Sequence, residues 1–522
     1  MEKMKPDTHN KNNLKFLIIV AFLSLLVDGA AAAHSHKHHS RGEYAPASAA
    51  VRSSCAATRS PDLCLSTSAA AFQASAFKIN GISELKKSLK TFSSETIKVA
   101  IERLEIVQRQ QKSLTRRDES AFHDCRVMIY NTAKQIGDSE DILNKYSESP
   151  DAAHKMELYN LLSAAQTNVF TCIDGFSHSE ADKLIQAKIL KTFLSNLYRK
   201  AKYLMSKADE TFKELKDQPV KSGMGEEWPE WLSIDDRKLL QDPAGKVVPD
   251  LTVAKKGGDY QTVSEAVAKA KEDAPKKSGK RYVIWIKEGE YMENVVIPME
   301  LTNLTFVGDG YDKTFIIASK NVVDGDTSFS SATVGVAGDG FIALDITFKN
   351  TAGPSKLQAV ALRVNADRAV FYNCHMIGYQ NTLYVHSLRQ FYKKCTISGT
   401  VYFIFGNAAA FFLDCDIQAR PPNSGLKNKI TAQGRELLNQ NTGIVIQKCR
   451  ITAELDAEGK FTTYLGWAWG EYSRTVVMQT EISGVIHPPG WSKWKGKFAL
   501  NWNGFQVLKD VEPFTIGNFL GS

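Results

Sequence analysis

What this sequence lacks limits its chemistry from the start. None of its eight cysteines forms a Cys-x-x-Cys pair, the spacing that most small zinc sites use, so a metal site is not expected. No zinc-finger, basic-helix or RNP-type motif accompanies the net charge of +8, and the basic residues are spread along the chain. The charge favours a polyanion such as anionic lipid or an acidic polysaccharide. Nucleic acid is not an expected partner.

The N-terminal apolar run is too short to span a membrane. FLIIVAFLSLLV has fewer than the roughly 20 residues that a spanning helix needs. Lysines precede this run and small residues ending at Ala33 follow it, which is the order of a secretory signal. We therefore expect residues 1–33 to be a signal peptide, with a signal anchor as the alternative. The mature protein is expected to be secreted, without stable membrane insertion.

The cysteines divide the chain into two units. In a secreted chain they indicate disulfides, and four lie before residue 175 and four after residue 370. The first unit is expected to be an α-helical bundle, because Ile97, Ala100, Leu104 and Val107 recur at the spacing of one helix face. Residues 211–248 are rich in proline, glycine and charge, which predicts an exposed linker.

Short β-rich runs follow residue 250. Examples are RYVIWIKEG and GIVIQKCRIT, and the helical stretch YQTVSEAVAKAKE is too little for βαβ crossovers throughout. Cys374, Cys395 and Cys415 fall about one solenoid coil, roughly 20 residues, apart. We predict a parallel β-helix, in which such positions lie about 4.8 Å apart and can bridge. A β-sandwich is the second candidate fold. We expect Cys415 to pair with Cys395 rather than Cys449.

At this point residues 45–210 resemble the pectin methylesterase inhibitor family. The resemblance rests on the cysteine frame CAATRSPDLC and on SAAQTNVFTCIDGF. It implies disulfides between Cys55 and Cys64 and between Cys125 and Cys172. The tetrapeptide at residues 237–240, RKLL, resembles the basic processing site that separates the two domains in pectinesterases preceded by an inhibitor domain.

Residues 249–522 look like plant pectin methylesterases over nearly their whole length. The segments that carry the resemblance, in family order, are GEYMENV, FVGDG, LQAVALRV, GYQNTLYVHS, GTVYFIFGNA, KNKITAQGR, NQNTG, YLGWAWGEYSRTVVMQT and GWSKWKGKFAL. The resemblance implies an all-β right-handed parallel β-helix with a cleft for homogalacturonan, acting in the cell wall without metal or cofactor. Family members continue after FAL through a Tyr-rich strand and a Gly-Pro-Gly loop that this sequence lacks, so one element is expected to be missing.

The chemistry of the family identifies the candidate catalytic positions. Hydrolysis of a methyl ester through an acyl-enzyme needs a carboxylate nucleophile, a second carboxyl as acid and base, and amide donors for the oxyanion. The family places these carboxylates in GTVDFIFG and GYQDTLY, with an arginine in LGRPW. Here Tyr402 stands for the nucleophile, Asn381 for the acid/base and Trp467 for the arginine, while the donors Gln358 and Gln380 remain.

Other positions bear on substrate binding and on a relocated nucleophile. Trp469 is retained, and Ser328 stands where the family has a substrate-contacting threonine, so both are expected at the substrate, together with Gln358 and the substituted Trp467. Asp414 and Asp416 flank Cys415, and a relocated nucleophile is conceivable there. We interpret these two aspartates as strand residues that face solvent.

The substitutions predict an inactive protein. A tyrosine with a pKa of about 10 is neutral in a mildly acidic cell wall, and asparagine cannot exchange a proton. An arginine left without its anion would be an unpaired buried charge costing about 3–5 kcal/mol, which Trp467 avoids. Three hypotheses follow: an inactive pectinesterase homologue that still binds homogalacturonan, an active esterase with unusual residues, or a protein whose helical domain inhibits other pectinesterases.

Overall fold

The computed structural model describes most of the chain after residue 81. The described residues are 82–92, 97–109, 111, 113–145, 152–176, 201–208, 227–241, 248–277, 279–454, 460–492 and 505–508. All of them belong to one compact unit, Ala49–Ser522. The predicted signal peptide and the predicted Cys55–Cys64 disulfide lie outside the described residues. None of the helices in these ranges combines the length and the apolar character that a bilayer crossing needs.

The described residues before position 210 are mostly helical, as predicted. The helices with their bounds are α4 (Ile82–Thr91), α5 (Ile97–Arg109), α6 (Arg116–Lys145) and α7 (Ala152–Gly175), and residues 201–208 are also helical. The residues that predicted α5 from their spacing, Ile97, Ala100, Leu104 and Val107, are all buried. A disulfide between Cys125 and Cys172 joins α6 to α7, the pairing that the family resemblance implied.

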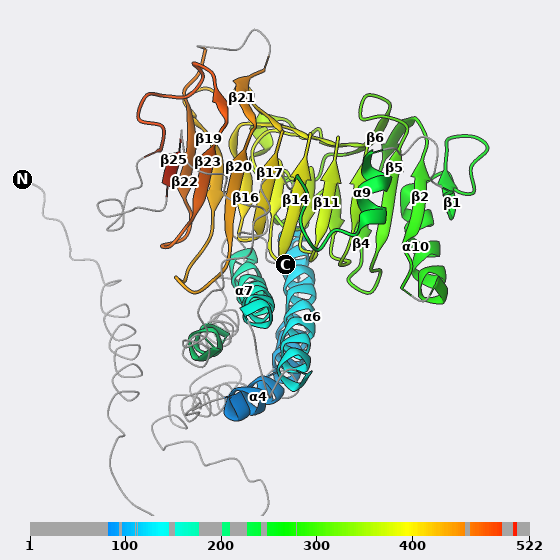
Figure 1. The fold of residues 1–522 in the computed structure, drawn as a ribbon, viewed down its shortest axis with the longest axis vertical. Helices are drawn as coiled ribbons and strands as arrows, with labels where there is room; N and C mark the ends of the chain where they lie inside the picture. Colours follow the sequence, from blue (N-terminus) through cyan, green and yellow to red (C-terminus); the bar gives the residue numbers. More distant parts are fainter. Residues whose placement is uncertain are drawn as a thin grey trace, which may run out of the picture. The chain divides into compact units, whose positions relative to one another are not determined.

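Residues 251–508 form three parallel sheets, named A, B and C here (Figure 1). Sheet A contains β1 (Leu251–Val253), β2 (Tyr282–Ile286), β5 (Leu304–Gly308), β8 (Ile342–Leu344), β11 (Ala369–Tyr372), β14 (Arg389–Lys393), β17 (Ala409–Leu413), β20 (Gly443–Gln447), β23 (Thr475–Met478) and β25 (Phe505–Leu508). Sheet B contains β3 (Gly289–Met292), β6 (Thr314–Ala318), β9 (Thr347–Asn350), β12 (His375–Ile377), β15 (Thr396–Gly399), β18 (Asp416–Ala419), β21 (Arg450–Ala453) and β24 (Glu481–Ile482). Sheet C contains β4 (Val295–Ile297), β7 (Val334–Val336), β10 (Leu362–Val364), β13 (Leu383–Val385), β16 (Val401–Gly406), β19 (Asn428–Gln433) and β22 (Thr463–Ala468).

The strand order establishes the predicted right-handed parallel β-helix. From β2 onward the chain visits sheets A, B and C in turn, so each coil adds one strand to each sheet. Equivalent side chains therefore stack inside the coil: the rings of Phe371, Tyr392 and Phe412 follow one another at 5.0 and 4.6 Å. Helix α10 (Val263–Asp273) forms within the stretch predicted to be helical, and the hydroxyl of Thr262 accepts from the backbone N–H of Glu265 at its start. The short 3₁₀ helices are η4 (Ala274–Lys277) and η5 (Pro354–Lys356).

The cysteines of the β-helix differ from the predicted pairing. The structure has no bond between Cys395 and Cys415, and Cys374 and Cys449 are also free, buried thiols. The four follow the ends of successive sheet A strands, which confirms the one-coil spacing. Each thiol instead lies near a strand carbonyl. The Sγ of Cys415, for example, lies 3.3 Å from the carbonyl oxygen of Leu413, and this contact takes the place of a bridge.

The predicted exposed linker is partly wrong. Residues 227–241 are ordered against sheet A and include helix α9 (Ile234–Gln241). Trp228, Leu232 and Leu240 are buried there. The proline and charge content of this region led to its interpretation as an exposed linker. Its apolar residues, however, are spaced so that they can reach one surface.

Candidate active site

Asn381 and Tyr402 occupy equivalent places on adjacent coils. Leu383 in β13 is paired with Ile404 in β16. Asn381 lies two positions before Leu383, and Tyr402 lies two positions before Ile404. The backbone N–H of Asn381 donates to the carbonyl of Val401 at 3.1 Å, which links the two coils at this point. The structure thus brings together the two positions at which the sequence predicted the nucleophile and the acid/base.

The backbone at both positions is unusual. Asn381 has φ of 66° and Tyr402 has φ of 52°, in the left-handed region that Asp and Asn tolerate and bulky residues seldom enter. At Tyr402 the pairing of β16 with β19 also shifts register between Val401 and Ile404, which is a β-bulge. Bulges and left-handed residues concentrate at functional sites. The backbone at position 402 thus has a conformation that suits an aspartate better than the tyrosine it carries.

Tyr402 is embedded among aromatic and basic groups. Its ring lies 5.3 Å from the ring of Trp467, centroid to centroid, so the residues at the nucleophile and arginine positions now pack together. The Nζ of Lys429 lies 5.2 Å from the centre of the Tyr402 ring. Burial raises the pKa of the Tyr402 phenol above its usual value. The phenol is therefore protonated at any acidic or neutral pH.

Three amide side chains belong to this region: the substituted Asn381 and the retained Gln358 and Gln380. Asn381 is 6% exposed, and its Oδ1 has no hydrogen-bond partner among the described residues. The Oε1 of Gln358 is likewise buried and unpartnered within that part of the chain. Gln380 directly precedes Asn381, and its carbonyl accepts from the N–H of Ala359 at 3.1 Å. The side-chain oxygens of Asn381 and Gln358 are both buried, so neither is open to a ligand in this conformation.

The outer face of sheet C carries a ladder across the site. Its members, in register from coil to coil, are Arg363, Tyr384, Phe405, Ala432 and Trp467. The rings of Tyr384 and Phe405 stack at 4.1 Å. These apolar side chains belong to the same hydrophobic cluster as the cores of α6 and α7. The helical part of the chain therefore packs on the face that bears Tyr402.

Helix α7 makes specific contacts at this face. The ring of Phe170 lies edge-on to Trp469, the predicted substrate-binding tryptophan, with the centroids 5.7 Å apart. The hydroxyl of Thr171 and the Nε2 of His386 are 2.9 Å apart. Burial, together with the charge of Arg363, lowers the pKa of His386 to about 3, so this imidazole is neutral.

Helix α6 contributes a buried carboxyl. Asp124 accepts a hydrogen bond from the hydroxyl of Thr327, in the loop that precedes Ser328. Burial raises the pKa of Asp124 to about 6, against this hydrogen bond and the nearby charge of Arg363. Burial lowers the pKa of Arg363 to about 10, and Asp124 opposes that shift.

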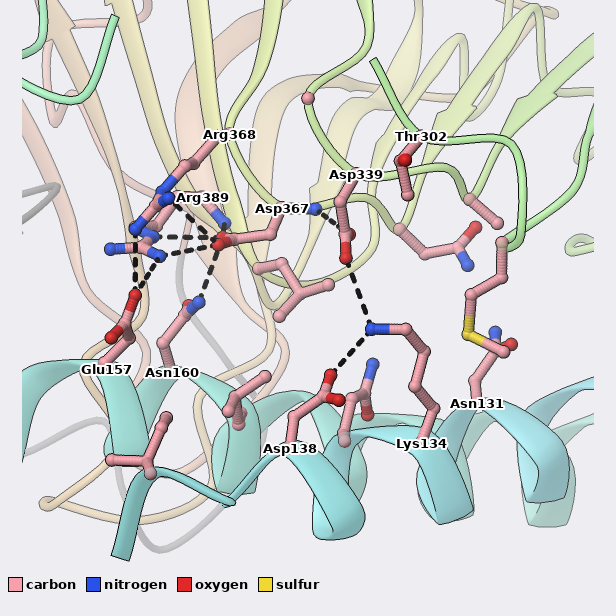
Figure 2. A pocket seen from close by; sticks show the side chains of 18 of the residues that line it. Asn131, Lys134, Asp138, Glu157, Asn160, Thr302, Asp339, Asp367, Arg368 and Arg389 are labelled. Atoms are coloured by element: carbon pink, nitrogen blue, oxygen red, sulfur yellow. Dashed lines mark hydrogen bonds and ion pairs between the residues drawn. The ribbon is translucent and has the colours of Figure 1, made fainter. Parts of the chain in front are cut away.

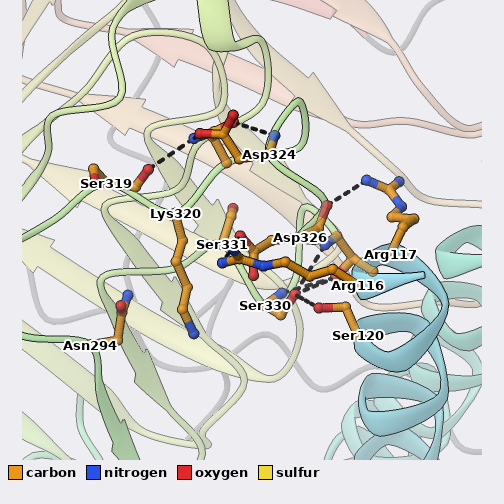
Figure 3. Close-up of polar contacts among 12 residues, drawn as sticks. Arg116, Arg117, Ser120, Asn294, Ser319, Lys320, Asp324, Asp326, Ser330 and Ser331 are labelled. Atoms are coloured by element: carbon orange, nitrogen blue, oxygen red, sulfur yellow. Dashed lines mark hydrogen bonds and ion pairs between the residues drawn. The ribbon is translucent and has the colours of Figure 1, made fainter. Parts of the chain in front are cut away.

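Around the same loop, the N-terminal residues of α6 hold the chain (Figure 3). Arg116 forms an ion pair with the carboxylate of Asp326 at 3.0 Å, and Arg117 donates to the carbonyl of the same residue. The hydroxyls of Ser120 and Ser330 are 3.2 Å apart. The loop that carries Ser328 is therefore held by α6.

A cavity of about 420 Å³ lies between these helices and the turns that follow the sheet C strands (Figure 2). Lys134 of α6 bridges Asp138 and Asp339, at 2.6 and 3.4 Å. Glu157 of α7 pairs with Arg368 at 2.8 Å, and Figure 2 shows the carboxylate of Asp367 directed toward Arg368 and Arg389. These charges are matched within the protein, so the cavity is a polar seam and not the site of the substituted residues.

The remaining predicted residues are Ser328, Asp414 and Asp416, and none of them joins Tyr402 and Asn381. Ser328 is partly buried, and its carbonyl accepts from the hydroxyl of Ser331 at 2.9 Å. Asp416 is on sheet B and pairs with Arg450 at 2.7 Å, while Asp414 follows sheet A and lies 3.9 Å from Lys393. Neither aspartate is on sheet C, so the structure gives no support to a relocated nucleophile. The described residues also contain no group of three metal-binding side chains.

Several residues of the site were not singled out from the sequence. Lys429 and Arg363 lay within quoted motifs, KNKITAQGR and LQAVALRV, but their place on the outer face of sheet C depends on strand register. Phe170 lay in SAAQTNVFTCIDGF, a segment that was used only for the family resemblance. Side chains alternate along a strand, so Arg363 and Tyr384, which follow the interior leucines Leu362 and Leu383, point to the same outer face.

Comparison with known proteins agrees with this architecture. The family model described as Pectinesterase matches residues 250–518, and the one described as Plant invertase/pectin methylesterase inhibitor matches residues 49–208. Pectinesterase/pectinesterase inhibitor 3 of Arabidopsis thaliana is 43% identical over 581 residues, covering 100% of this chain and 97% of the relative. Pectinesterase 3 of Citrus sinensis is 44% identical over 534 residues, covering 93% and 88%.

A solved structure resembles the β-helix half. The pectin methylesterase from carrot is 52% identical, with a TM-score of 0.50, and the match covers 53% of this chain and 94% of the carrot chain. The carrot chain thus corresponds to about half of this one. Both family models match in the order that the fold shows, and relatives match along nearly the full length. The chain therefore belongs to the pectinesterase family, in its form with an inhibitor domain, whose members modify pectin in the plant cell wall.

Proposed function

We propose that this protein is a secreted cell-wall pectinesterase homologue that binds homogalacturonan without hydrolysing its methyl esters. The observation that carries the proposal is the pair at the catalytic positions: Tyr402 packed on Trp467, and Asn381 beside it. A phenol with a raised pKa is not ionised at the pH of the cell wall, and an amide neither attacks an ester nor shuttles protons. Positioning and oxyanion donors alone leave little catalysis.

Binding needs less than catalysis, and the surface around Tyr402 that we propose as the binding groove keeps groups suited to it. Lys429 supplies a cation for a galacturonate carboxylate, and Trp467 and Trp469 supply flat apolar surfaces of the kind that pack against sugar rings. Replacing two carboxylates by neutral groups also removes repulsion toward a polyanion. De-esterified chains should therefore bind better than methylated ones.

The helical part affects access to this groove. Phe170 of α7 contacts Trp469 and the cores of the two parts merge over sheet C. A polysaccharide must compete with these contacts in the full chain. The β-helix half corresponds to a protein that exists alone in carrot, so residues 249–522 form a suitable second test protein. The same contacts occupy α7 within its own chain, so we do not favour inhibition of other pectinesterases as the function.

The test is a calorimetric titration of residues 249–522 and of the full chain with fully de-esterified oligogalacturonides. We expect weak binding at low salt that is lost at high ionic strength, tighter for residues 249–522 than for the full chain. Lys429→Ala should weaken binding several-fold. Arg450→Ala removes an equal charge on sheet B, where Arg450 pairs with Asp416, and should change little. No binding at low salt, or binding indifferent to salt, would count against a pectate-binding homologue.

A further inference from the structure

The segment before the β-helix, residues 227–241, is here called the docked linker, and it lies on the outer face of sheet A. Trp228 is 7% exposed, Leu232 is 3% exposed and Leu240 is fully buried. They join a hydrophobic cluster that is separate from the β-helix interior and from the cluster over sheet C. Its sheet A members include Val307, Ile342, Leu344, Val370 and Phe391. Along each strand, these outward-facing residues alternate with residues that face the interior of the coil. Without the docked linker, this apolar face would be open to water.

Two cations of the β-helix anchor the docked linker, one at its first residue and one within helix α9. The guanidinium of Arg281 donates to both carboxylate oxygens of Asp236, at 2.7 and 3.0 Å, and this pair is mostly buried. The Nζ of Lys393 donates to the carboxylate of Glu227 at 2.7 Å and lies 4.7 Å above the ring of Trp228. A bidentate arginine pair fixes orientation as well as distance. The docked linker therefore has one defined seat on sheet A.

The basic tetrapeptide at residues 237–240 is folded inside this seat. Its residues belong to helix α9, which starts where the hydroxyl of Ser233 accepts from the N–H of Asp236. The guanidinium of Arg237 donates to the carbonyls of Leu232 and Pro229, both at 3.0 Å. Leu240, the last residue of the tetrapeptide, faces the sheet. Both the backbone and two of the four side chains are thus engaged.

A protease binds its substrate as an extended chain, so a docked helix has to detach and unwind before it can be cut. Cleavage of such a bond follows the fraction of molecules in which the segment is open. We propose that docking on sheet A withholds the basic tetrapeptide from proteases in the folded protein. Cutting at residues 237–240 then requires the docked linker to detach, or takes place before it docks. Sheet A is in this sense a binding surface whose partner is the chain's own linker.

The proposal is independent of what the groove binds, and it is tested on the full chain. Limited digestion with trypsin, followed by mass spectrometry, gives a cleavage rate for each bond. The bonds after Arg237 and Lys238 are compared with those after Lys256 and Lys427, which are exposed and lie outside regular structure. We expect the bonds in α9 to be cut at least tenfold more slowly than these reference bonds. Equal rates in the unaltered protein would overturn the proposal.

Variants of sheet A change the docking without changing the sequence that the protease reads. Arg281→Ala removes the pair with Asp236, and Phe391→Ala removes part of the surface under Trp228, whose ring lies 6.0 Å away. Each should speed cleavage in α9 several-fold and leave the reference bonds unchanged. Arg450→Ala on sheet B should alter neither. The proposal would fail if cleavage in α9 did not respond to these variants. It would also fail if all bonds sped up together, because the helix would then open only with the whole domain.

Discussion

At the scale of single residues, the three substitutions form one consistent change. Removing the anion at position 402 would leave an arginine at position 467 without a partner, and the structure instead packs Trp467 on Tyr402. Asn381 keeps the size and the left-handed backbone of an aspartate but not its proton chemistry. Under the proposed function, the backbone of the site is kept while its catalytic groups are replaced. Activity would then return only when all three positions are restored, because each restored charge needs the others.

This coupling predicts an order of rescue. Tyr402→Asp with Asn381→Asp should stay near background in methanol release, since two adjacent carboxylates without an arginine to orient and pair with one of them repel each other, and one takes up a proton. Adding Trp467→Arg should raise turnover by at least tenfold over the double variant. The comparison is made on residues 249–522, with Trp467→Arg alone as the control. A double variant as active as the triple variant would refute the coupling.

At the scale of elements, the turns after six successive sheet A strands, β8 to β23, repeat one backbone conformation. The residue that follows the strand has φ between 49° and 60° in six coils, and these residues are Asp345, Asn373, Lys394, Asp414, Lys448 and Gln479. Asp and Asn adopt this conformation at low cost, whereas longer side chains pay roughly 1 kcal/mol. Half of the turns thus carry a residue that suits the conformation and half carry one that does not.

The mismatch predicts a stabilising substitution. Lys448→Asn should raise the free energy of unfolding by about 0.5–1 kcal/mol, because asparagine tolerates the φ of 51° at this turn. Asn373→Lys, the reverse change in an equivalent turn, should destabilise the protein by a similar amount or more, since it also removes a hydrogen bond to Asp345. Thermal melting of the two variants beside the unaltered protein checks both. Opposite signs would show that contacts of Lys448 outweigh its backbone.

At the scale of the whole molecule, a buried carboxyl makes stability depend on pH. The pKa of Asp124 is raised to about 6 by burial, above its ordinary value of 3.8. Between these values the unfolded chain has lost the proton that the folded chain keeps, so stability falls as pH rises from 4 to 6 and levels off above. The loss is on the order of 3 kcal/mol.

Asp124→Asn should remove this slope, since its amide oxygen can still accept from Thr327 but does not titrate. Melting temperatures between pH 4 and 7 make the measurement, and Glu105→Gln on the exposed side of α5 is the control. We expect the unaltered protein to lose stability relative to Asp124→Asn across this range. Parallel curves for the two proteins would contradict the assignment to Asp124.

Most of the architecture could be predicted from the sequence, because it follows from repeated local patterns. The spacing of Cys374, Cys395 and Cys415 gave the coil length, and the spacing from Ile97 to Val107 gave α5. What depends on distant contacts could not be predicted. The packing of Phe170 on Trp469 and the docking of Trp228 on sheet A join segments that are far apart in sequence. The spacing in the sequence predicted a bridge between Cys395 and Cys415, but both thiols are free in the structure.

The central claim is that the groove no longer hydrolyses esters, and methanol release from highly methyl-esterified homogalacturonan tests it most directly. Residues 249–522 avoid competition from α7, so this half is assayed beside the full chain, with heat-denatured protein as the blank. We predict release at the level of the blank for both. Turnover above the blank that Tyr402→Ala abolishes would contradict the account, because Tyr402 would then be a working catalyst.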